Sequence, residues 1–211
     1  MSYKRNIPLL YVITGLSWTR FFIPVLALFY IASQVPIEQF TAIMSIFSLT
    51  IILLEVPSGV IADLIGKKRT LLISKFLYVL EIYLIAFHNG FWIFLIAKII
   101  SGIGVSLTSG ADQALLYDTL KKIKKEKEHK KIIGTFFTIQ NATKAAVFIA
   151  GGFLFAINYK LPAILSLPFM ISAFVICLFL KEPYISGKKL RVISSFKHLK
   201  ESLIYFWRHS Y

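Results

Sequence analysis

Charged residues and cysteines are scarce in this chain of 211 residues, and each shortage excludes a class of protein. Only 16% of the residues are charged while 57% are hydrophobic, and the mean hydropathy is +0.72. Soluble domains have about 25% charged and about 45–50% apolar residues, so one water-soluble core cannot bury this excess. The single cysteine, Cys177, excludes an intrachain disulfide and lies in an apolar run. The composition therefore predicts an integral membrane protein.

Acidic residues are also few, and the resulting charge raises the question of a nucleic-acid partner. Ten Asp and Glu stand against 24 Lys and Arg, which gives a net charge of +14. The basic residues form short clusters between long apolar runs rather than an amphipathic surface. Basic groups on one side of a membrane produce this distribution, so we expect contact with membrane lipids and no nucleic acid.

Catalytic and metal-binding patterns are missing from the sequence. The four histidines, His88, His129, His198 and His209, fall in predicted loops or in the tail. No H-x-x-x-H, C-x-x-C or G-x-S-x-G pattern occurs. We therefore predict no enzyme activity, no metal and no cofactor, with an intramembrane enzyme kept as an alternative.

Six apolar stretches are long enough to cross a bilayer, which takes about 20 residues. They cover residues 7–33, 38–58, 70–87, 91–117, 133–157 and 161–180. The first is too long for the apolar part of a secretory signal, so we interpret it as a retained span. We predict an all-α, polytopic six-helix bundle over residues 1–182. Residues 183–211 are predicted to form a cytoplasmic linker with an amphipathic helix on the membrane surface.

The basic residues indicate the orientation of these spans. Nineteen Lys and Arg lie before span one and after spans two, four and six, whereas the three opposite loops contain only Lys160. Cytoplasmic loops carry the excess of basic residues. We therefore predict a multi-pass protein of the plasma membrane with both termini in the cytoplasm.

The loop between spans two and three carries the most specific motif. Residues 59–71 read GVIADLIGKKRTL, which resembles motif A of the major facilitator superfamily (MFS), G-x-L-A-D-R-x-G-R-K/R-x-x-L. The matches are Gly59, Ala62, Asp63, Gly66, Lys68 and Leu71. Lys67 replaces the usual Arg and keeps its charge but not its bidentate fork. Leu64 departs from the usual basic residue. Gly59 and Gly66 are expected to let the short loop reverse.

The resemblance implies that this loop latches the cytoplasmic side and helps to govern switching between inward-open and outward-open states. The latch of the family also uses an acidic residue at the inner end of span four, where Asp118 stands. It therefore implies a cluster of Asp63, Lys67 and Asp118. The alternative is that Asp118 only terminates its helix.

Span four offers a weaker second resemblance. Residues 98–104 read KIISGIG and look like motif B, R-x-x-x-G-x-G, with Lys98 in place of Arg followed by Gly102 and Gly104. The Arg of this motif is associated with proton coupling in many members, so its replacement weakens that inference. Gly102, Ser106 and Gly110 also form a small-residue stripe suited to close helix packing. Motif C of the antiporters is absent from span five.

The span count, the topology and these motifs resemble the N-terminal six-helix half of an MFS transporter. The resemblance implies secondary-active transport of a small solute by alternating access, coupled to an ion or a proton. It also implies a second six-helix half as partner, either a second copy or a C-terminal half that is missing or separate. Multidrug-type efflux, or a truncated or regulatory protein without transport of its own, is the alternative function.

Five charged or polar residues inside the spans are candidates for a substrate cavity: Arg20, Asp112, Gln140, Asn141 and Lys144. Such groups are costly in hydrocarbon and are expected to face the bundle or a water-filled path. Their net positive charge predicts an anionic or polar solute. One alternative is pairing between helices, of Arg20 or Lys144 with Asp112 or Glu81. Another is that Lys98 snorkels to the outer interface.

Overall fold

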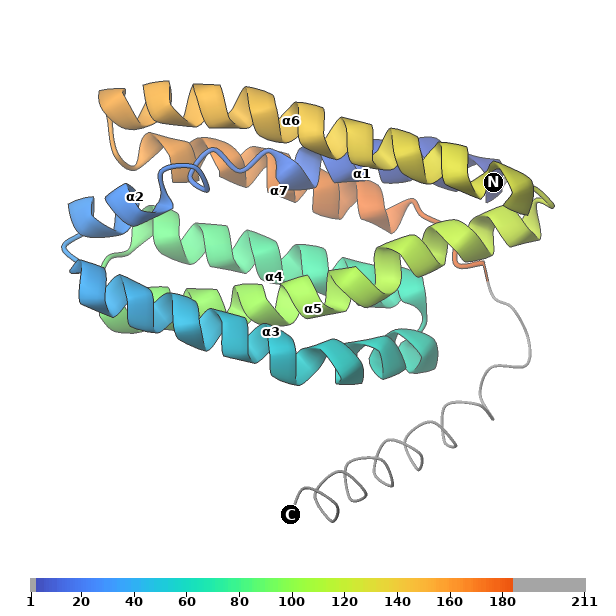
Figure 1. Ribbon diagram of the computed structural model, residues 1–211, viewed down its shortest axis with the longest axis horizontal. Coiled ribbons are helices and arrows are strands. Elements are labelled where there is room, and N and C mark those ends of the chain that lie inside the picture. Colours follow the sequence, from blue (N-terminus) through green and yellow to red (C-terminus); the bar gives the residue numbers. More distant parts are fainter. Residues whose placement is uncertain (1–2, 184–211) are drawn as a thin grey trace, which may run out of the picture.

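The computed structural model describes residues 3–183, which are 86% helical and contain no strand in that range. Two short 3-10 helices, η1 (Tyr3–Arg5) and η2 (Glu126–Glu128), precede α1 and α6. The α-helices of this part of the chain are drawn in Figure 1. They are α1 (Asn6–Trp18), α2 (Leu26–Ala32), α3 (Ile37–Ile65), α4 (Lys67–Phe87), α5 (Phe91–Lys122), α6 (His129–Ile157) and α7 (Leu161–Leu178).

Five of these helices, α3 to α7, are long and apolar enough to cross a membrane. They correspond to the second to sixth predicted spans, although α3, α4, α5 and α6 extend beyond the predicted limits. The first predicted span is instead divided into α1 and α2, each shorter than a membrane helix. The described residues therefore contain five continuous membrane-length helices, where the sequence predicted six. The predicted amphipathic helix lies outside the described residues.

The division of the first predicted span has a local cause. Pro24 lies inside the seven residues that separate α1 from α2. Proline lacks a backbone N–H, its ring clashes with the carbonyl four residues earlier, and it disfavours helical backbone in the residue before it. The unwound segment is held by its neighbours, because the Phe21 N–H donates to Ser166 Oγ of α7 at 2.9 Å. Irregular backbone is tolerated at membrane depth where protein surrounds it in this way.

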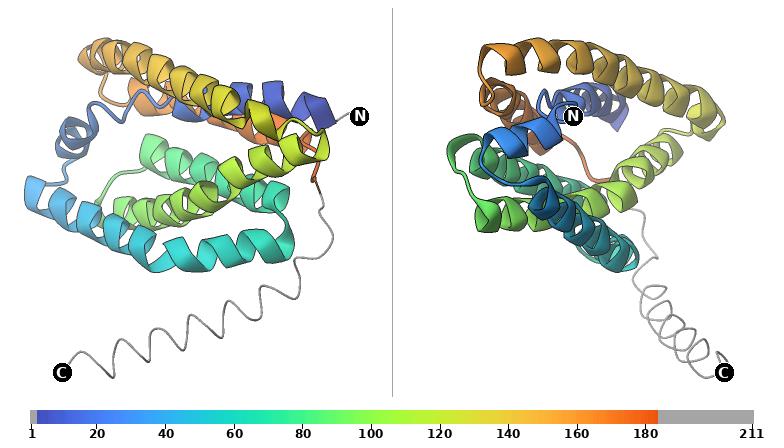
Figure 2. Two further views of the ribbon diagram at one scale, coloured as in Figure 1. Left: turned by 45° about the vertical axis from the view of Figure 1, so that its right-hand side comes forward. Right: turned by 60° about the vertical axis from the view of Figure 1, so that its left-hand side comes forward.

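The helices form two groups of three that lie side by side. One group contains α3, α4 and α5, and the other contains α1, α6 and α7, while α4 and α7 join the groups. Both views in Figure 2 show this division. Two buried apolar clusters fill the bundle, one around Phe22, Phe29 and Phe94 and one around Leu10, Leu71 and Leu115. The packing therefore leaves α3 and α6 on the outside of their groups.

Small residues set the contact between α3 and α5. A Cβ on Gly102 would lie 3.0 Å from the side chain of Thr50, and one on Gly110 would lie 3.3 Å from the Cα of Gly59. Ser106 Oγ donates to the Ile51 carbonyl at 3.3 Å across the same contact. The predicted small-residue stripe is therefore confirmed as a helix-packing face.

Candidate functional site

The motif A residues lie at the end of the bundle where α3 gives way to α4. A single residue, Gly66, connects the two helices, and its φ of +98° lies in a region that favours glycine. The Lys67 ammonium donates to the carboxylate of Asp118 at the end of α5. Asp63 lines the same cavity of about 670 Å³ as Lys67, Lys68 and Asp118. The structure thus brings together the residues of the expected latch.

Gly59 does not occupy the place that the sequence predicted for it. It lies inside α3, and its backbone packs against Gly110 of α5. Asp63 likewise belongs to the last turn of α3, so it precedes the start of α4 by one short connection. The prediction that Gly59 lets the loop reverse is therefore wrong, because α3 continues through it to Ile65. Its physical role is close approach between two helices.

Glu182 also lies at this end of the bundle, and no motif in the sequence pointed to it. Its two carboxylate oxygens accept the backbone N–H groups of Lys67 at 3.1 Å and Lys68 at 2.7 Å. The first N–H groups of a helix lack partners within the helix, and a negative charge is favoured there. The Lys68 ammonium also donates to the Leu178 carbonyl at 2.8 Å. The segment after α7 is thereby tied to the start of α4.

A second cluster of charges lies deeper in the bundle, around Glu81 of α4. Glu81 is fully buried, and its Oε1 accepts a hydrogen bond from the Lys98 ammonium at 2.7 Å. The Arg20 guanidinium lies 3.7 Å from Glu81 Oε2. Pairing between helices is therefore observed for Arg20 and Glu81. The alternative that Lys98 snorkels to the interface is wrong, since Lys98 is 5% exposed and bonded inside the bundle.

Arg20 also secures the end of α1. Its Nε donates to the Ser17 carbonyl at 3.1 Å, and its backbone N–H donates to the Trp18 carbonyl at 2.8 Å. Its guanidinium carbon lies 3.9 Å from the centre of the Tyr78 ring. A cation near the C-terminus of a helix is favoured by the helix dipole. Arg20 therefore hydrogen-bonds a backbone carbonyl at the end of α1 and also forms an ion pair with Glu81.

The other candidates for the cavity lie apart from this cluster. On α6, Gln140 and Lys144 are half-buried and Asn141 is exposed, and the Lys144 ammonium lies 3.8 Å from the centre of the Trp18 ring. Asp112 of α5 is half-buried and accepts a hydrogen bond from the N–H of its neighbour Gln113 at 2.6 Å. The structure therefore places Lys144 against α1 rather than with an acidic residue.

Several polar and small residues of α5 contact α4. Lys98 bonds Glu81, Gly104 packs against the Tyr78 ring, and Thr108 bonds Ser74. The motif B-like glycines thus allow close packing on two different helices, because Gly102 contacts α3 and Gly104 contacts α4. Asp112, closer to the motif A end of α5, forms no ion pair among the described residues.

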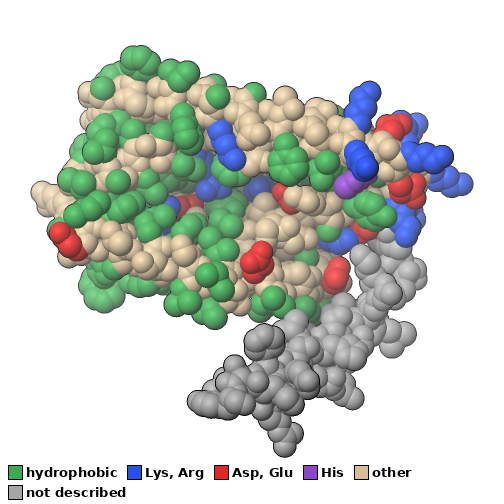
Figure 3. Space-filling model, viewed as in Figure 1, with side chains coloured by type: hydrophobic (Ala, Val, Ile, Leu, Met, Phe, Trp, Pro, Cys, Tyr) green, Lys and Arg blue, Asp and Glu red, His purple; other side chains and the backbone are tan. Residues whose placement is uncertain are grey.

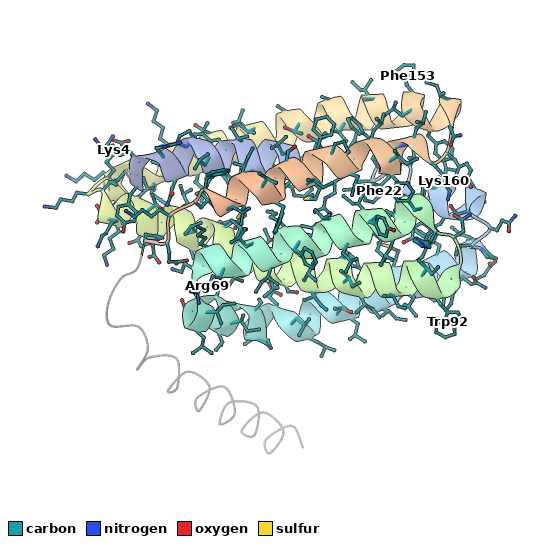
Figure 4. The ribbon with its side chains drawn as sticks, turned by 180° about the vertical axis from the view of Figure 1, so that it is seen from behind. Lys4, Phe22, Arg69, Trp92, Phe153 and Lys160 are labelled. Carbon is teal, nitrogen blue, oxygen red and sulfur yellow. The ribbon has the colours of Figure 1, made fainter. Side chains whose placement is uncertain are left out.

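Charges are distributed unequally over the surface of the molecule. Figure 3 shows Lys and Arg side chains gathered at one end, and a smaller mixed group in the hollow between the two sets of helices. In Figure 4 Lys4 and Arg69 lie at the same end, and Lys160 and Trp92 lie at the opposite end, with Phe22 between the helix groups. The basic end is the end that carries the motif A residues.

The chain matches a known protein family. A family model described as Major Facilitator Superfamily matches residues 9–210, which is nearly the whole chain. None of the curated proteins compared with the chain matches it.

Proposed function

Since this chain belongs to the Major Facilitator Superfamily and is a membrane transporter, we propose that it carries a small anionic or polar solute by alternating access. The observation that supports this solute class is Lys144 near the middle of α6, half-buried and stacked on Trp18. A cation there costs about 2.5–3.5 kcal/mol against hydrocarbon, so it belongs on a protein-facing or water-filled path. Gln140 and Asn141, one turn away, add hydrogen-bonding groups.

The five candidate residues contribute differently to this proposal. Arg20 is engaged by Glu81 and by the end of α1, so its contribution is to shape the site. Asp112, Gln140, Asn141 and Lys144 keep polar atoms for a solute.

The proposal is tested by measuring uptake and efflux of radiolabelled carboxylates in cells that produce the transporter, with Lys144→Met as the variant. We expect Lys144→Met to lower kcat/KM by about tenfold or more, the effect of losing one charged contact. Lys130→Met, at an exposed position in the first turn of α6, is the matched control. Transport of a hydrophobic cation that ignores Lys144→Met would reject this solute class and favour multidrug-type efflux.

We propose further that the motif A cluster controls switching between the two access states. Lys67 bonds Asp118, Asp63 lines the same cavity, and the three come from the ends of α3, α4 and α5. Relative movement of these helices would have to break the contact. Asp63→Asn should therefore lower turnover while the amount of protein inserted in the membrane stays unchanged. Normal turnover by this variant would contradict the latch.

We propose that α1 and α2 together make the first of six membrane crossings. We also propose that the protein lies in the plasma membrane, with its motif A end on the cytoplasmic side. Figure 1 supports the crossing by α1 and α2, because the N-terminus and α2 lie at opposite ends of the bundle. The basic residues of this end support a cytoplasmic location.

We propose that a second six-helix half packs against α3 and α6. Large apolar side chains are exposed on both helices, among them Ile52 and Leu53 of α3 and Ile149 and Phe153 of α6. The two halves of MFS proteins rock about a site between them. The alternative is a regulatory protein without transport of its own. The uptake and efflux measurement on the assembled protein tests this alternative.

A further inference from the structure

Lys75 of α4 and Asp112 of α5 carry opposite charges, and neither forms an ion pair in the described part of the chain. Lys75 of α4 is 4% exposed and has no hydrogen bond or ion pair within the described part of the chain. Its closest aromatic contact is the Tyr78 ring, with the ammonium 5.4 Å from the ring centre. Asp112 of α5 lies within electrostatic reach of Lys75 but forms no ion pair with it.

Other charged and polar residues of α4 and α5, on either side of Lys75 and Asp112, do form contacts between the two helices. Toward the basic end of the bundle, Lys67 of α4 bonds Asp118 of α5. Toward the other end, Glu81 of α4 bonds Lys98 of α5. Between them Ser74 bonds both Thr108 Oγ1 and, at 2.8 Å, the Gly104 carbonyl. These neighbouring polar groups of α4 and α5 are therefore in contact, whereas Lys75 and Asp112 form no ion pair with each other.

An open pair of this kind is costly unless something fills it. Removing a charge from water without a partner costs several kcal/mol, and the cost is greater in a membrane. Arg20, another cation near Lys75, is paired with Glu81 and repels the Lys75 ammonium. Cys177 of α7 is the remaining ionisable group near Lys75, and it is buried.

We propose that Lys75 and Asp112 bind the two charged ends of a zwitterionic solute of the α-amino acid type. This inference rests on the proposed transport function and narrows its substrate class. The Lys75 ammonium would bind the carboxylate of the solute, and the Asp112 carboxylate would bind its ammonium group. A solute with one charge satisfies one of the two groups and leaves the other without a partner, whereas a zwitterion satisfies both.

The site is tested by binding to the purified full chain in nanodiscs, measured as a rise in melting temperature with ligand concentration. The zwitterionic probes are L-alanine, L-leucine and L-glutamine. Propionate and propylamine, which have the carbon count of alanine and one charge each, are the comparison probes. We expect at least one amino acid to stabilise the protein at concentrations where neither single-charge probe does.

The variants are Lys75→Met and Asp112→Asn, with Lys130→Met and Glu126→Gln as controls at exposed positions. Each of the first two should weaken amino acid binding by about tenfold or more, and the controls should leave it unchanged. Lys75→Met should melt no lower than the parent without ligand, because it replaces an unpaired buried charge with an apolar chain. A lower melting temperature would indicate a structural role and overturn the proposal.

Two other outcomes would also overturn the site. If no amino acid stabilises the chain, or if stabilisation survives both variants, the zwitterion site is wrong. If propionate alone stabilises the chain and Lys144→Met removes that effect, the broader proposal of an anionic solute stands and only the zwitterion inference fails.

Discussion

Glu81 is the residue on which the buried charges depend, because one carboxylate neutralises two cations, Arg20 and Lys98. Glu81→Gln would leave both cations inside the bundle without an anion. Breaking a buried pair by removing one partner costs about 3–5 kcal/mol. We therefore expect a clear fall in the melting temperature of the purified protein, measured by tryptophan fluorescence in detergent.

The matched control for this prediction is Glu38→Gln in the first turn of α3, where the side chain is exposed. A second variant, Glu81→Gln with Lys98→Met, should melt above Glu81→Gln alone, since it removes one of the two unpaired cations. Equal melting of the parent and Glu81→Gln would show that the cluster adds nothing to stability.

Single residues show where prediction from the sequence fails. Asp118 was placed correctly beside Lys67 because a family motif specified both. Lys98 was open to misreading as an interfacial lysine, because the chain does not reveal that Glu81 lies opposite it on the next helix. Glu182 gave no signal in sequence, since its role depends on where the segment after α7 meets the first N–H groups of α4. Partners between distant helices require the packing.

At the scale of helices, five of the six predicted spans appear as continuous helices. Apolar length alone gave the approximate limits of these five, because it is a property of each segment by itself. The break in the first span depends on Pro24, which the sequence contains, and on the support that Ser166 of α7 gives to the unwound backbone. Proline kinks and proline breaks have the same sequence signature, so the packing decides between them.

The contact of α6 with this break makes Gly151 critical. A Cβ at Gly151 would lie 2.3 Å from the Phe21 carbonyl oxygen and 2.8 Å from Pro24 Cγ, so α6 would have to move away. We expect Gly151→Ala to lower the free energy of unfolding by about 1–3 kcal/mol, the usual cost of overpacking. The measured effect would be a lower melting temperature of the purified variant.

Gly152 supplies the control within the same helix. A Cβ there meets nothing within 4 Å, so Gly152→Ala gains helix propensity without a clash. We expect it to melt at or above the parent temperature. If the two alanine variants behave alike, α6 does not pack on the unwound segment as described.

The whole molecule has one strongly basic end, and its orientation can be measured directly. In a Cys177→Ala background the chain has no other cysteine, so Lys130→Cys and Lys160→Cys would each report on one end of the bundle. We expect a membrane-impermeant maleimide to label Lys160→Cys in intact cells. Lys130→Cys should react only after the membrane is made permeable, because the start of α6, where Lys130 lies, is proposed to be cytoplasmic. The reverse pattern would show that the proposed orientation is wrong.

The final prediction concerns whether this chain transports alone. Ile52 and Leu53 of α3 and Ile149 and Phe153 of α6 are each more than 60% exposed, on the two outer helices of the bundle. Lipid can cover these apolar side chains, but it cannot solvate Lys144 of α6 without the cost of a charge in hydrocarbon. A second half would cover both, and the solute path of the family lies between two halves. We therefore expect the monomer to move no solute when it is reconstituted in liposomes. A dimer by light scattering would identify a second copy as the partner, and activity restored by a separate six-helix half would identify that half. A monodisperse monomer that still moves solute across liposomes would contradict the need for any partner.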